Sequence, residues 1–207
     1  PVYSSFAVIG GDVFRKALEK RNLKGMTESP AAADVILVGP GAKGYPDLTE
    51  MVRAGKRVAA FGLSAEEIRR ILPGVKAENV KAGASQIADL KAPELRGISN
   101  MDSYFQHRLD YAAVDGKEIA VLRIGKGSAV MVGVAPWMLD YNKFFRLRSS
   151  FRRRAFLMSQ ILRNAGIASE SVLLERFASE AQKEPWKNSY YLQDPISGDD
   201  PYRYYHW

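Results

Sequence analysis

Short, largely apolar runs recur along the first third of this chain, and segments with helical spacing separate them. The runs cover residues 6–9, 34–38 and 57–61, and a glycine follows each run at once. Such runs are typical of parallel strands that are buried on both faces of a sheet. The intervening segments predict helices over 12–21, over 47–54 and from Ser64 to the residue before Pro73. Alternation of this kind predicts a mostly parallel sheet with helices on both faces.

The later part of the chain predicts a hairpin followed by the strongest helix. Strands at 118–124 and 129–135 flank Gly125–Ser128, a turn whose glycines supply positive φ angles. Residues 149–165 then follow a helical period. The apolar stripe of this helix is formed by Phe151, Ala155, Met158, Leu162 and Ala165. We expect the arginines near its start to lie off this stripe.

Two further patterns concern the first helix and an irregular segment. Helix 12–21 is expected to bury Val13, Ala17 and Leu18. Residues 83–111 show no clear period, which predicts a loop-rich segment over one end of the sheet.

The C-terminal residues differ from the rest in being rich in aromatic side chains. Residues 172–177 are predicted as an edge strand, which completes a domain over 1–177. Residues 178–207 form a tail with seven aromatics, among them Trp186, Tyr202, Tyr204 and Trp207. Burying one aromatic side chain is worth roughly 1.5–3 kcal/mol, so we expect the tail to dock on this domain or on a partner.

Composition and charge restrict the functions to be considered. The 207 residues include no cysteine, which excludes disulfides, thiolate nucleophiles and cysteine-ligated metals. No apolar run approaches the roughly 20 residues of a membrane span. The chain begins at Pro1 without an initiator methionine or a signal-like apolar segment, which predicts a processed or truncated start.

A net charge of +7 is concentrated partly in one segment, residues 143–154. Its cations are Lys143, Arg146, Arg148, Arg152, Arg153 and Arg154. We interpret Arg146, Arg148, Arg152 and Arg153 as interface residues, because arginine is enriched at protein contacts. Nucleic-acid binding is not expected, since no recognisable binding module or stacking platform accompanies the charge.

A glycine pattern follows the second predicted strand. Gly39, Gly41 and Gly44 match the spacing that lets a backbone approach a pyrophosphate. The acidic residue that normally holds the ribose about 20 positions later is missing, because Gly62 and Leu63 occupy that place. We therefore expect a turn at the end of a strand and no cofactor, with phosphate or nucleotide binding as an alternative.

Ser64 follows the third predicted strand, the place of a nucleophile in a strand–turn–helix elbow. His107 and Asp110 would be the base and the residue that orients it. The competing interpretation is a helix N-cap, since Glu67 stands three residues after Ser64 and completes a capping-box pattern. We prefer the cap and keep the serine hydrolase as an alternative.

Metals and sugars are the remaining ligand classes. The chain has two histidines, His107 and His206, too few to favour a zinc site, so no metal is predicted. Carbohydrate is an alternative partner, because Trp137, Tyr141 and Phe144 with Phe145 would suit stacking on a sugar. We prefer to interpret these aromatics as core or interface packing.

The order of these motifs resembles the class I glutamine amidotransferase-like fold, a flavodoxin-like three-layer sandwich. The resemblance spans most of residues 3–167. It is carried by Asp34–Gly41 (DVILVGPG), Ala54–Arg57 (AGKR), Phe61–Ser64 (FGLS), the hairpin at Gly125–Ser128 leading to Val132–Val134, and Leu162–Gly166 (LRNAG). Amidotransferases carry cysteine where this chain has Ser64, so glutamine hydrolysis is not implied. A serine peptidase branch of the fold carries serine there, although Glu66 replaces the closing glycine of the elbow.

The ending Asp199–Trp207 (DDPYRYYHW) resembles the C-terminal tail of bacterial glycoside hydrolase family 2 type proteins. Non-catalytic amidotransferase-like modules also accompany β-galactosidase-like enzymes and contribute to their oligomer contacts. The resemblance implies a scaffold or interface domain acting in carbohydrate degradation. Its partners would be the remainder of a parent chain or a second copy. An extracellular or periplasmic location would follow from that parent, while the composition leaves the compartment open.

Overall fold

The computed structural model describes residues 3–83, 91–105, 107–142, 144 and 147–169. The first half comprises β1 (Phe6–Ile9), α1 (Asp12–Glu19), β2 (Leu23–Lys24), β3 (Val35–Val38), α2 (Thr49–Arg53), β4 (Arg57–Phe61), α3 (Ala65–Ile71) and β5 (Ala77–Ala82). The second half comprises η1 (Pro93–Leu95), α4 (Asn100–Ser103), β6 (Leu109–Val114), β7 (Ile119–Ile124), β8 (Gly127–Val132), η2 (Pro136–Met138), α5 (Arg148–Asn164) and β9 (Ala168–Ser169).

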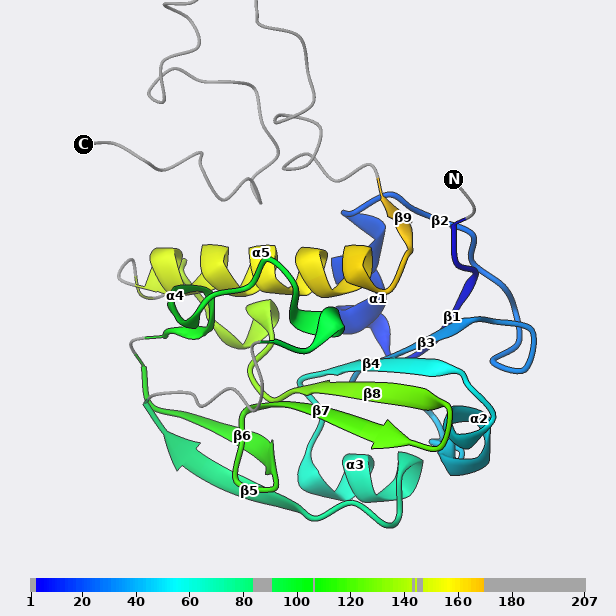
Figure 1. Ribbon diagram of the computed structural model, residues 1–207. Coiled ribbons are helices and arrows are strands. Elements are labelled where there is room, and N and C mark those ends of the chain that lie inside the picture. The colour runs from blue at the N-terminus through cyan, green and yellow to red at the C-terminus, as the bar shows by residue number, and fades with distance from the viewer. Residues whose placement is uncertain (1–2, 84–90, 106, 143, 145–146, 170–207) are drawn as a thin grey trace, which may run out of the picture.

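A five-stranded sheet in the order β1-β3-β4-β8-β7 forms the centre of the molecule. The first four strands are parallel and β7 runs antiparallel to β8, so the predicted mixed sheet with a late hairpin is confirmed. An isolated parallel bridge joins Met26 to Phe6, which places a further short segment beside β1. Helices α1 and α5 lie over one face of the sheet and α2 and α3 over the other (Figure 1).

Alternate residues of each strand enter two separate cores. Val35 and Leu37 pack in the layer that contains α1 and α5, whereas Ile36 and Val38 pack in the layer that contains α2 and α3. Every residue of β3 is buried, as expected of a parallel strand covered on both faces.

Two helix faces differ from the expectation. In α1, Phe14 and Leu18 are buried and Val13 is 54% exposed, so the inward position assigned to Val13 was wrong. In α5, Arg154 lies on the buried face, which corrects the expectation that every arginine lies off the core stripe. In both helices the buried residue shares the helical spacing of the core face, since Phe14 is four residues before Leu18 and Arg154 is four residues before Met158.

The segment predicted as loop-rich holds more structure than expected. It contains η1, α4 and the start of β6, which pairs antiparallel with β5 in a separate two-stranded sheet. A third small sheet joins β9 to β2. The strand predicted at 172–177 and the tail predicted at 178–207 lie outside the described residues.

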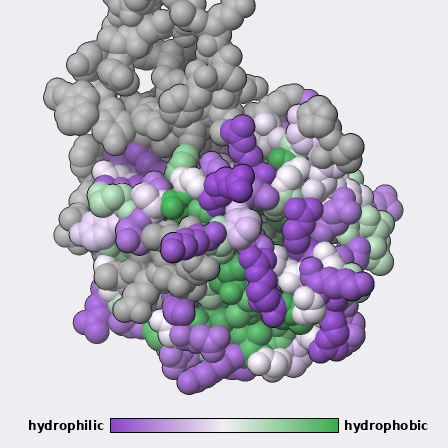
Figure 2. Space-filling model, viewed as in Figure 1, coloured by the Kyte–Doolittle hydropathy of each residue, from purple (hydrophilic) through white to green (hydrophobic). Residues whose placement is uncertain are grey.

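Strand β7 forms an edge of the main sheet. Its Val121, Leu122 and Ile124 are only partly buried, and Arg123 is exposed. Hydrophobic residues gather over the β7–β8 region within a mostly hydrophilic face (Figure 2).

Candidate functional site

The carboxyl ends of the parallel strands are where ligands usually bind in open α/β sheets. In this protein the ends of β3 and β4 carry the glycine pattern and Ser64, the two predicted site features. This edge of the sheet is therefore the first candidate for a binding site.

Ser64 is the N-cap of α3 and forms the predicted capping box with Glu67. Its hydroxyl donates to Oε2 of Glu67 at 3.0 Å and accepts from the Glu67 backbone N–H at 3.2 Å. The Ser64 backbone N–H donates to the same carboxylate oxygen at 2.8 Å. The hydroxyl is thus held by the helix start that sequence analysis favoured.

The other members of the hypothetical triad lie elsewhere. Asn79 accepts a hydrogen bond from the Ala65 N–H at 3.0 Å and pairs with Ala112 across β5 and β6. From Ala112 to Leu109 the extended strand covers about 10 Å, and His107 lies beyond Leu109. The structure therefore does not bring the His107 ring to Ser64.

The observed contacts of the two partners agree with that separation. The ring of His107 lies 5.9 Å from the ring of Phe144, centroid to centroid. Asp110 forms an exposed ion pair with Lys81 at 3.8 Å. Neither contact orients an imidazole toward the start of α3.

The glycine pattern packs against the protein's own side chains. A β-carbon added at Gly39 would overlap the ring of Phe14, which is fully buried. A β-carbon at Gly11 would lie 2.6 Å from the Gly41 carbonyl oxygen, and the Gly11 N–H donates to the Pro40 carbonyl at 2.8 Å. Gly39 and Gly11 thus permit close internal packing, Gly41 has a positive φ of 79°, and Gly44 has no neighbour within 4 Å of such a carbon.

Tyr45 joins the glycine turn to the capping box. Its hydroxyl donates to Oε1 of Glu67 at 2.8 Å, lies 3.0 Å from the Gly39 carbonyl oxygen and accepts from the Ala42 N–H at 3.2 Å. Burial raises the pKa of Tyr45 to about 12, and the hydrogen bond to Glu67 contributes to that rise. The phenol therefore stays protonated at neutral pH and acts as a fixed donor.

The aromatics considered as an alternative sugar platform lie in separate packing contacts. The Trp137 ring packs edge-on against Phe14 with centroids 5.7 Å apart. The Tyr141 ring packs on Phe151 at 4.7 Å. Phe144, which is 41% exposed, keeps a ring at the surface.

The structure describes three of the four predicted interface arginines. Arg148, Arg152 and Arg153 lie half-buried in the first turns of α5, and the Arg153 guanidinium lies 5.4 Å from the centre of the Tyr104 ring. Tyr104 is 40% exposed and Met101 on the same segment is 61% exposed. Arg146, Trp186, Tyr202, Tyr204 and Trp207 lie outside the described residues.

A buried ion pair, which sequence analysis missed, lies behind this surface. Nη1 of Arg154 lies 2.9 Å from Oε2 of Glu118, and both side chains are 0% exposed. Glu118 also accepts from the Val134 N–H at 2.7 Å, and Arg154 donates to the Ser103 carbonyl. Desolvation raises the pKa of Glu118, and Arg154 opposes that rise. The pair joins α5 to β7, α4 and the end of β8.

Metal-binding groups and membrane-spanning helices are both absent from the described residues. The described part of the chain holds no group of three or more histidine, aspartate or glutamate side chains placed to bind a metal ion. No helix within the described residues has the length and apolar character needed to cross a bilayer.

We compared the chain with protein-family models, curated proteins and solved structures, and none of the three comparisons gave a match.

Proposed function

We propose that this chain is a non-catalytic scaffold and interface domain of a bacterial, β-galactosidase-like glycoside hydrolase. The single observation that carries the proposal is the engagement of Ser64 in the capping box of α3. Because the hydroxyl donates to Glu67 and accepts from its N–H, attack on a substrate would require both of these cap hydrogen bonds to be released. The assignment of a parent enzyme rests on two resemblances, that of the motif order to the amidotransferase-like fold and that of the ending Asp199–Trp207 to glycoside hydrolase family 2 type proteins.

The sheet order supports the flavodoxin-like, amidotransferase-like part of the proposal. With the segment around Met26 counted as a rudimentary edge strand, the parallel part reads Met26-β1-β3-β4-β8. This is the 2-1-3-4-5 order of flavodoxin-like sheets. In that order the ligand crevice lies between β1 and β3, where Phe14 here covers Gly39.

Fluorophosphonate labelling distinguishes a scaffold from the serine hydrolase alternative. We expect no labelling that depends on Ser64 when the wild type is compared with Ser64→Ala. Loss of the cap should instead lower the free energy of unfolding by about 1 kcal/mol, measured by urea denaturation. Ser99→Ala is the matched control, because the Ser99 hydroxyl donates to Asp102 at 2.7 Å in the same way. Labelling lost only in Ser64→Ala would support a hydrolase and overturn the proposal.

The interface role is tested at the start of α5. Arginine and aromatic side chains are enriched where protein contacts are strongest, and Arg153 lies over the exposed Tyr104 ring. Arg153→Glu should weaken association with a second copy or with the parent chain about tenfold or more, measured by sedimentation. Arg163→Glu, at the opposite end of α5, should leave association unchanged. Equal effects of the two substitutions would argue against a specific surface.

A further inference from the structure

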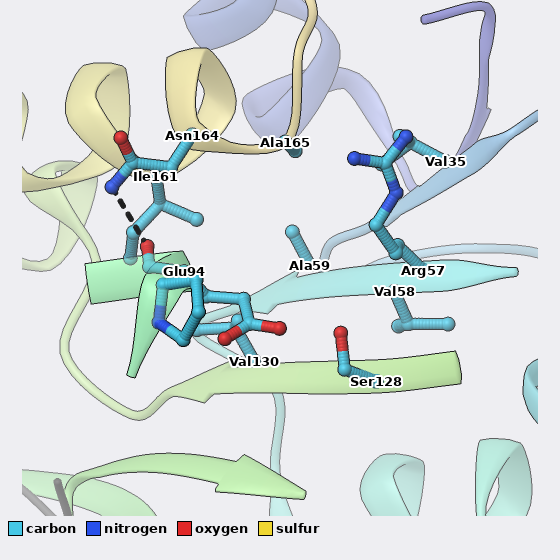
Figure 3. A pocket seen from close by; sticks show the side chains of 11 residues that line it. Val35, Arg57, Val58, Ala59, Glu94, Ser128, Val130, Ile161, Asn164 and Ala165 are labelled. Carbon is cyan, nitrogen blue, oxygen red and sulfur yellow. Dashed lines mark hydrogen bonds between the residues drawn. The ribbon is translucent and has the colours of Figure 1, made fainter. Parts of the chain in front are cut away.

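A pocket of about 240 Å³ lies between the C-terminal end of α5 and the sheet. Val35 and Arg57, the first residues of β3 and β4, line it together with Ser128 near the start of β8. The pocket is therefore at the amino ends of the parallel strands, opposite the edge that carries Ser64. The close view shows α5 above it and β4 and β8 below (Figure 3).

Most of the pocket wall is apolar. Ala59, Val130 and Ile161 contribute side chains from β4, β8 and α5. A mainly apolar cavity with a few polar groups is the usual form of a small-molecule site. A cavity of about 150 Å³ holds benzene, so this pocket has room for a ring of that size with one small polar substituent.

Glu94 on η1 lines the pocket with a carboxylate whose charge is already paired with that of Arg123. Nη2 of Arg123 donates to its Oε2 at 2.8 Å, and the Glu94 side chain is 16% exposed. Burial raises the pKa of Glu94, but hydrogen bonds from Arg123 and Ser128 outweigh it and lower the pKa below its usual value. Glu94 thus stays ionised and paired, and it does not call for a cationic ligand.

Arg57 retains unused hydrogen-bonding capacity on another side of the pocket. Its Nη2 donates to the Ser4 hydroxyl at 2.8 Å, which is the one side-chain hydrogen bond of Arg57 found among the described residues. The nearby Asp34 carboxylate accepts from the Ser5 N–H at 2.9 Å and from the Ser5 hydroxyl at 2.8 Å. These hydrogen bonds and, to a lesser extent, the charge of Arg57 lower the pKa of Asp34. A guanidinium has several planar N–H donors and matches a carboxylate bidentately.

We propose that this pocket binds a small monocarboxylate with a compact apolar body. The carboxylate contacts Arg57, and the apolar body lies against Ala59, Val130 and Ile161. A neutral ligand of the same shape would lose the charge-assisted hydrogen bonds to Arg57. A cationic ligand would in addition be repelled by that guanidinium.

Three probes of similar shape and different charge test this site on the whole chain: benzoate, benzamide and benzylamine. We expect benzoate to bind at least tenfold more tightly than benzamide, and benzylamine more weakly than either. Dissociation constants from calorimetry, with NMR shifts of the Ala59 and Ala165 methyl groups, would locate the binding. Preferential binding of benzylamine, or no benzoate binding at millimolar concentration, would overturn the proposal.

Variants then assign the interaction to Arg57. Arg57→Gln should weaken benzoate binding about tenfold, to the benzamide level, and Arg57→Lys should retain part of the preference for benzoate. Ala165→Leu, which fills the pocket edge, should weaken both ligands. Arg53→Gln is the matched control, because Arg53 lies on α2 in an exposed pair with Glu50. Circular dichroism verifies that each variant folds, and unchanged benzoate affinity in folded Arg57→Gln would overturn the assignment.

Discussion

Replacing Glu118 with alanine is expected to lower the free energy of unfolding by about 3–5 kcal/mol. The substitution leaves the Arg154 guanidinium charged and 0% exposed without its carboxylate partner. It also removes the acceptor of the Val134 N–H. A large loss is expected because several kcal/mol of desolvation cost are no longer offset. Urea denaturation would measure this loss, provided that the dependence of the unfolding free energy on urea concentration is unchanged.

Two controls separate burial of the charge from loss of an ordinary ion pair. Glu50→Ala breaks the exposed pair with Arg53 and should cost less than about 1 kcal/mol. The double variant Glu118→Leu with Arg154→Met replaces the buried charges with apolar groups and should recover most of the loss. If Glu118→Ala cost no more than Glu50→Ala, the pair would not have the stabilising role inferred from its burial.

Replacing Phe14 with alanine is expected to cost about 3–5 kcal/mol. Its ring is fully buried, and it packs edge-on against Trp137 and near Phe61, with centroids 5.7 and 6.3 Å away. Gly39→Ala alone should cost about 1–3 kcal/mol through overpacking, because its methyl group would overlap the same ring. Thermal and urea unfolding would measure both losses.

The losses of unfolding free energy caused by Phe14→Ala and by Gly39→Ala should not be additive. In the Phe14→Ala background the methyl group of Gly39→Ala enters vacated space, so its cost should fall to below about 1 kcal/mol. Val13→Ala is the matched control on the same helix, since Val13 is 54% exposed, and its effect should stay within about 0.5 kcal/mol. Strict additivity of Phe14→Ala and Gly39→Ala would contradict the packing described here.

The central strands could be predicted because burial on both faces produces a distinct local pattern. Each apolar run closes at a glycine, and the structure places β1, β3 and β4 there. The two-stranded β5–β6 sheet gave no such signal, because β5 buries Ala77 but exposes Glu78, Asn79 and Lys81. Its stability depends on strand pairing between residues 27 to 37 positions apart, from Ala82 with Leu109 to Ala77 with Val114, which local periodicity does not report.

The capping box, the buried ion pair and the pocket also differ in how far apart their residues lie in the sequence. The capping box of Ser64 is local and was predicted from a spacing of three residues. Arg154 is three and four residues before the core residues Leu157 and Met158, a helical spacing that could have placed it on the buried face. Its pairing with Glu118 joins positions far apart in the chain. The pocket lining likewise comes from positions far apart in the chain. Arg57, a charged residue at the start of an apolar strand, was the one local indication of it.

The beginning and the end of the described body meet at one place. The Ser4 N–H donates to the Gly166 carbonyl at 2.9 Å, and β9 pairs with β2 close by (Figure 1). These main-chain contacts hold both the segment before β1 and β2 against the residues that follow α5, so α5 cannot shift along the sheet without breaking them.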